Sequence, residues 1–170
     1  MDNLAPNALA PHAFGIVLSL LSIVWGFALG GLMGAMDSDA KDMLRQRANR
    51  VLATVYGGDE QKRETVVSKA WKYCIRAHIH GGSIGTAALA AILLLAQLGE
   101  AGWLERASSL AFGAGALIYS IYWLVAGIRT VDMGSPKAAK HSLGFIAIPG
   151  AGLALLGLFG TLVATVMRLF

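Results

Sequence analysis

Three of the four histidines are the side chains of this 170-residue chain best suited to chemistry. His78 and His80 stand two residues apart, and His141 follows a lysine much later in the chain. Each histidine lies at the start of a long apolar stretch. Neutral imidazole is the protein side chain that most often ligates haem iron, zinc or copper. The three residues are therefore the candidate cofactor-binding and metal-binding residues.

The spacing of His78 and His80 separates their roles. Each residue of a helix turns by about 100°, so these two side chains point about 200° apart. His78 shares its face with Gly82 and Gly85, where small residues leave room for a flat cofactor, and it is the favoured inward residue. A b haem held by two histidines would then use His78 and His141.

Two other interpretations of the histidines stay open. A zinc or copper ion prefers three or four ligands, which the histidines could supply together with Cys74 or Asp132, although helix geometry makes this convergence awkward. Histidines at a helix end near the head groups also bond to water, lipid phosphate or a carbonyl without any cofactor. His12 begins the first apolar stretch on the opposite side, roughly 30 Å away, and does not join the others.

The segment Ala77-His78-Ile79-His80, followed by glycines, resembles the Ala-His-x-His segment of short membrane proteins related to haem-copper oxidase subunit one. It is also similar to the membrane haem proteins linked to nitric oxide responses. The resemblance covers about ten of the 170 residues and implies haem b as a cofactor. Those proteins have more spans and more histidines, so a binuclear centre and oxygen reduction are not implied.

Four long apolar stretches must position these histidines. Hydrophobic residues make up 56% of the chain and charged residues 14%, against roughly a quarter charged in an ordinary soluble domain. Each stretch exceeds the roughly 18 to 20 residues that a helix needs to cross a bilayer. The stretches cover residues 13–36, 77–98, 107–128 and 142–167. The sequence therefore predicts an all-α membrane protein, with four transmembrane helices bundled in a single membrane domain, and excludes a soluble nucleic-acid-binding protein.

Lysine and arginine are distributed unevenly between the two sides of this bundle. Of the 14 basic residues, nine lie in 37–76 and three in 129–140, which fall on the same side of a four-span protein. Only Arg106 and Arg168 fall on the other side. The positive-inside rule predicts that the basic side is cytoplasmic and that both termini are periplasmic, in a bacterial inner membrane. The basic segment is also expected to attract anionic lipid head groups.

The segment 37–76 is too regular for a plain loop. Apolar residues repeat at helical spacing, a turn is expected at 56–59, and helical composition resumes at Glu60. We expect spans one and two to extend out of the membrane and to meet here as an antiparallel helical hairpin. An amphipathic helix lying on the inner leaflet is the alternative. The apolar positions of the expected seam are Leu44, Ala48, Val51, Leu52 and Val55.

Glycines recur at every fourth residue in two of the spans. They are Gly26, Gly30 and Gly34 in span one, and Gly81 and Gly85 in span two. Such stripes let helix backbones approach closely, either within the bundle or between copies of the chain.

The spans carry no Asp, Glu, Lys or Arg in their interiors, which argues against a proton-coupled or ion-coupled transporter. The chain also has no phosphate-binding loop, nucleophile elbow or metalloprotease motif. We interpret it as a small non-catalytic subunit or interaction protein of a larger membrane complex, in contact with other subunits or with its own copies. The alternative is a b-haem-binding electron-transfer anchor that uses the histidines of spans two and four.

Overall fold

A computed structural model describes residues 8–170, and every regular element in that range is a helix. The elements are the short 3₁₀ helix η1 (Ala10–His12) and the helices α1 (Ala13–Ala35), α2 (Asp37–Arg50), α3 (Leu52–Tyr56), α4 (Glu60–Gln97), α5 (Trp103–Met133), α6 (Pro136–Ser142) and α7 (Gly144–Leu169). Four of these, α1, α4, α5 and α7, are long and apolar enough to cross a membrane. The all-α membrane bundle predicted from the sequence is confirmed.

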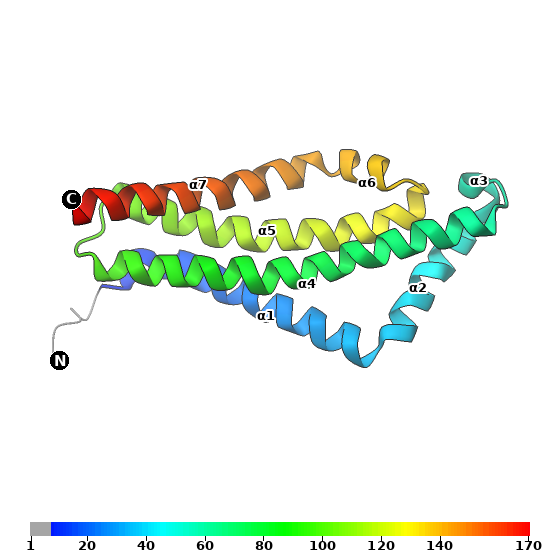
Figure 1. Ribbon diagram of the computed structural model, residues 1–170, viewed down its shortest axis with the longest axis horizontal. Coiled ribbons are helices and arrows are strands. Elements are labelled where there is room, and N and C mark those ends of the chain that lie inside the picture. Colours follow the sequence, from blue (N-terminus) through cyan, green and yellow to red (C-terminus); the bar gives the residue numbers. More distant parts are fainter. Residues whose placement is uncertain (1–7) are drawn as a thin grey trace.

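The four long helices lie side by side, with α2, α3 and α6 gathered at one end of the bundle (Figure 1). We call this end the hairpin end, and the end that holds η1 and Phe170 the terminal end. Helix α5 packs against α1, α4 and α7 and therefore forms the centre of the bundle. Helices α4 and α7 both pack mainly on α5 and touch each other much less.

Helix lengths explain why one end projects. Helix α4 has 38 residues, or about 57 Å at 1.5 Å per residue, which exceeds the roughly 30 Å of a hydrocarbon core. The predicted spans coincide with α1, the second part of α4, the middle of α5, and α7. Helix α7 begins at Gly144 rather than at residue 142, because Leu143 leaves the helical conformation (φ −110°, ψ 15°) and separates α6 from α7.

The first arm of the hairpin differs from the prediction. Helix α1 ends at Ala35, Met36 is not helical (φ −126°, ψ 36°), and α2 runs back towards α4 (Figure 1). The expected continuation of span one as a single helix is therefore wrong, whereas span two does continue as part of α4. Glycines near the end of α1 weaken that helix, and Asp37 and Asp39 favour a new helix start because carboxylates interact well with a helix N-terminus.

The apolar seam of the hairpin is confirmed as a packing surface. Leu44 and Ala48 of α2 are 1% and 0% exposed, in one cluster with Val66 and Ala70 of α4. The other three seam positions are half-buried at the edge of the same cluster; they are Val51, Leu52 and Val55. Helix α2 thus packs on α4 through the face that its sequence periodicity indicated.

The turn between the two arms also lies where it was predicted. Gly57 and Gly58 both have positive φ, 65° and 79°, a backbone conformation that glycine adopts without steric cost. The Asp59 side chain then accepts a hydrogen bond from the Lys62 backbone N–H at 2.9 Å and caps the first turn of α4.

Candidate functional site

His78 lies in the crossing between α1 and α4. Its Nδ1 donates a hydrogen bond to the Gly26 carbonyl at 2.7 Å. Its ring rests against Gly30, where even a Cβ atom would collide with the imidazole. Of the two glycines beside which the sequence suggested space for a flat cofactor, Gly85 packs on α1, whereas nothing lies within 4 Å of a Cβ at Gly82.

The glycine stripes form this same helix crossing. A Cβ at Gly81 would lie 2.9 Å from the Gly26 Cα, and Gly85 also packs directly on α1. Ser22 strengthens the contact, because its hydroxyl donates to the Gly81 carbonyl at 3.1 Å. Gly34 takes no part, since nothing lies within 4 Å of the position where its Cβ would be.

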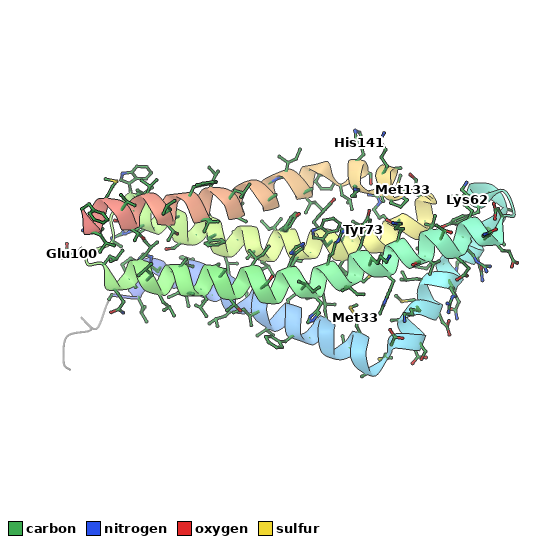
Figure 2. The ribbon with its side chains drawn as sticks, viewed as in Figure 1. Met33, Lys62, Tyr73, Glu100, Met133 and His141 are labelled. Carbon is green, nitrogen blue, oxygen red and sulfur yellow. The ribbon has the colours of Figure 1, made fainter. Side chains whose placement is uncertain are left out.

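The other two candidate histidines point elsewhere. The ring centroid of His80 lies 5.2 Å from that of Tyr119 and 6.1 Å from that of Trp123, so His80 faces α5. His141 belongs to α6, where it is exposed on the outer side of the bundle (Figure 2). The opposed directions of His78 and His80 agree with their spacing in the sequence.

This arrangement does not fit a b haem or a metal ion held by the three histidines. His78 is held by the Gly26 carbonyl and by Gly30 of α1, His80 faces α5, and His141 is exposed on α6. Within residues 8–170, no group of three or more His, Cys, Asp or Glu side chains is placed to hold a metal ion. The haem interpretation stays a prediction that no side-chain geometry favours.

A cluster of aromatic rings lies between α4 and α5, and sequence reasoning missed it. We call it the aromatic cluster; its members are Tyr73, Tyr119, Tyr122 and Trp123. The ring centroids of Tyr73 and Trp123 are 5.0 Å apart, and Tyr73 lies on the inner side of α4 (Figure 2). The signal in the sequence was the i, i+3, i+4 spacing in α5, which places three rings on one helix face.

Two cations lie over these rings. The guanidinium carbon of Arg76 is 4.8 Å from the Trp123 ring centroid and 5.4 Å from that of Tyr73. The Lys140 ammonium is 5.9 Å from the same Tyr73 ring. Among the described residues, neither cation has a carboxylate partner. The aromatic cluster therefore holds two positive charges in place without neutralising them.

Two polar contacts hold the hairpin to α5. Arg47 donates from Nε and Nη2 to the two carboxylate oxygens of Asp132, at 3.1 and 2.7 Å, and these bonds raise the pKa of Arg47. The Tyr56 hydroxyl donates to the Val131 carbonyl at 2.7 Å. This carbonyl belongs to the last turn of α5, whose carbonyls lack helical partners. Asp132, considered above as a metal ligand, is therefore engaged in an ion pair between helices.

Replacing Tyr56 with phenylalanine is expected to lower the free energy of unfolding by about 1 kcal/mol, because the Val131 carbonyl loses its donor. Burial, and then the Asp132 carboxylate, raise the pKa of Tyr56 above its ordinary value of about 10. The stability from such a group is complete below its unfolded pKa and is lost as the pH rises through its folded pKa.

The native protein should therefore lose stability above about pH 10, and Tyr56→Phe should lack that component. Denaturant unfolding in detergent, followed by circular dichroism across this range, measures both effects. Parallel pH profiles for the two proteins would contradict the assignment.

The terminal end is closed by a second set of contacts. His12 is 1% exposed, and its Nδ1 lies 2.7 Å from the Ser109 hydroxyl, which itself donates to the Glu105 carbonyl at 2.8 Å. Because that hydroxyl proton is already used, His12 donates to Ser109 rather than activating it as a base. Arg168 donates to the Glu105 carboxylate at 3.1 Å and ties α7 to α5. As predicted, His12 lies at the opposite end from the other histidines.

Comparisons with known protein families, with curated proteins and with solved structures find no match to this chain. Its own geometry therefore defines it, as a four-helix membrane bundle with a packed helical hairpin at one end and a cation-bearing aromatic cluster beside it.

Proposed function

We propose that this protein is a non-catalytic subunit of a membrane complex, and that its hairpin docks onto an acidic surface of a neighbouring subunit. The observation that carries this proposal is a rigidly held hairpin with exposed cations that have no carboxylate partner among residues 8–170. These cations are Arg50, Lys62, Lys69 and Lys72.

The attachment of the hairpin supports a docking role. The buried Leu44 and the Arg47–Asp132 ion pair hold α2 on the bundle, so Arg50 of α2 is presented in a fixed arrangement beside the three lysines of α4. A preformed surface pays less conformational entropy on binding than a mobile loop. Unpaired positive charges favour an acidic partner through electrostatic complementarity, which also accelerates encounter.

The polar groups that could act together chemically support a non-catalytic role. His12 bonds to Ser109, Ser109 donates to the Glu105 carbonyl, and Arg47 and Asp132 form an ion pair between helices. His78 is held against the Gly26 carbonyl. Each of these groups stabilises a contact between helices, and each leaves little freedom for proton transfer to a substrate.

The orientation is part of the proposal. The excess of basic residues at the hairpin end favours its placement in the cytoplasm of a bacterium, with both termini in the periplasm. A cysteine placed at Lys62, at the tip of the hairpin (Figure 2), should then react with a membrane-impermeant maleimide only after the inner membrane is opened. Labelling of intact spheroplasts at this position would contradict the orientation.

The docking surface is tested with a photo-crosslinking amino acid at Lys62 in living cells. We expect one membrane-protein adduct, attached close to acidic residues of that protein. The double variant Lys69→Glu, Lys72→Glu should reduce the adduct about tenfold, because like charges across an interface repel. Reversing the charge of the partner's acidic residues should restore it.

Arg106→Glu provides the matched control, since this exposed cation lies near the terminal end and forms no ion pair with a described carboxylate. That variant should leave the adduct unchanged. Two outcomes would overturn the docking proposal. One is crosslinking to lipid alone, and the other is an adduct yield that stays unchanged in the Lys69→Glu, Lys72→Glu variant.

A further inference from the structure

We infer that the groove between α4 and α7 binds one anionic phospholipid, with its phosphate between Arg76 and Lys140 and one acyl chain in an apolar crevice farther along α4. This inference goes beyond the docking of a protein partner and does not depend on it. It combines the two unpaired cations of the aromatic cluster with a cavity toward the middle of the bundle.

The groove follows from the way the long helices pack. Helix α5 contacts both α4 and α7 along their lengths and forms the floor, while α4 and α7 form the two walls (Figure 1). Between these walls lies an open crevice of about 310 Å³. Its apolar lining includes Ile84 and Ala87 of α4, Phe112 of α5, and Ala154, Leu155 and Leu158 of α7.

One face of α4 connects the cations to the crevice. Arg76, His80, Ser83 and Ala87 follow one another at intervals of four, three and four residues, which keeps them on one side of the helix. The distance along the axis from Arg76 to Ala87 is about 16 Å. This matches half the thickness of a hydrocarbon core, about 15 Å, and therefore the depth that one acyl chain occupies.

The groups at the head of the groove can bind an anion and have no described partner. Arg76 and Lys140 lie over the aromatic rings without a described carboxylate partner. Trp123, which is 8% exposed, has a buried indole N–H with no acceptor among residues 8–170. Arginine binds phosphate oxygens through two parallel N–H groups, and the ring beneath the guanidinium restricts its orientation.

The apolar lining of the crevice indicates that the part of the ligand beyond its phosphate is a hydrocarbon chain. Its one hydroxyl group, on Ser83, already donates to the Ile79 carbonyl at 2.7 Å, so the crevice offers dispersion contacts and no free donor. A free phosphate would leave it empty, and a neutral hydrocarbon would leave the cations unpaired. A zwitterionic lipid would bring its own positive group near Arg76 and Lys140. An anionic phospholipid satisfies both parts of the groove.

Native mass spectrometry of the purified full chain tests the head-group contact, with phosphatidylglycerol or phosphatidylcholine of identical acyl chains added. The wild-type protein should retain phosphatidylglycerol at least tenfold better. The double variant Arg76→Gln, Lys140→Gln should lose this preference about tenfold, whereas Arg76→Lys should keep most of it. The matched control Arg50→Gln, Lys62→Gln removes two exposed cations of the hairpin and should bind as the wild type does.

The acyl-chain contact has its own variants. Ala87→Phe fills the crevice and should reduce phosphatidylglycerol binding about tenfold, while Ala90→Phe, at an exposed alanine outside the crevice, should not. Glycerol phosphate, which has the head-group phosphate without chains, should fail to displace the lipid. Circular dichroism checks that each variant folds. If the double variant Arg76→Gln, Lys140→Gln does not fold, the single variant Lys140→Gln replaces it in the binding measurement.

Equal retention of both lipids, or unchanged binding in the folded Arg76 and Lys140 variants, would overturn the inference. Displacement by glycerol phosphate would show a site for free anions instead and would also overturn it. None of these outcomes depends on the crosslinking yield at the hairpin. The lipid proposal can therefore be contradicted while the docking proposal holds, and the reverse is also true.

Discussion

Replacing Gly26 with leucine should separate α1 from α4 and lower the free energy of unfolding by about 3 kcal/mol, at the upper end of typical overpacking costs. Any side chain at this position meets the backbone of Gly81 and Gly82 and the carbonyl of His78. Because these are backbone atoms of a continuous helix, no rotamer change relieves the clash. The helices must move apart, which also weakens the bond between His78 and the Gly26 carbonyl.

Gly34→Leu is the matched control for this effect. Gly34 belongs to the same four-residue stripe, but nothing lies within 4 Å of its Cβ position. Its substitution should change the free energy of unfolding by less than about 0.5 kcal/mol, as is usual at exposed sites. Unfolding of the two variants in the same detergent, followed by circular dichroism, compares them directly. Equal losses would mean that the close contact between Gly26 and α4 does not set the cost, because leucine favours a helix more than glycine does at both positions.

Replacing Leu44 with aspartate should release α2 from α4. Leu44 is 1% exposed in an apolar cluster, and an unpaired carboxylate there costs several kcal/mol unless the site opens to water. We expect local opening rather than global unfolding, because α1, α4, α5 and α7 pack together without α2. Release lets the backbone of α2 unfold around Arg45, Arg47 and Arg50, which are trypsin cleavage sites.

Limited trypsin digestion measures this release. Cleavage within α2 should be at least tenfold faster in Leu44→Asp than in the wild-type protein. Met43→Asp introduces the same charge at a neighbouring residue that is 51% exposed, and its cleavage rate should stay close to the wild-type rate. A wild-type protein that trypsin cuts as quickly as the Leu44 variant would show that the hairpin is not packed.

The sequence by itself determined the class of fold. Four apolar stretches of sufficient length are enough to predict helices, because a lipid-exposed backbone must satisfy its hydrogen bonds internally. The period of the apolar residues in 37–56 likewise placed Leu44 and Ala48 on the packed face of α2. Gly57 and Gly58 marked the turn, because their conformation is readily adopted only by glycine.

The tertiary structure alone decided how each long helix is rotated about its axis. Inside the spans almost every face is apolar, so hydropathy does not show which side meets another helix. Close backbone contacts settle it instead, and they turn His78 into the α1–α4 crossing and His80 towards α5. The spacing of the two histidines predicted their opposed directions, but which helix each one faces came from the packing.

The sequence also could not predict which residues of distant segments contact each other. Arg47 and Asp132 are 85 residues apart, and each resembles any other exposed charge in its own segment. The break at Met36 brings α2 back against the bundle and makes their ion pair possible. The aromatic cluster likewise draws its rings from α4 and α5 and its second cation from α6. Spacing places such residues on a helix face, but only the packing of helices determines which faces meet.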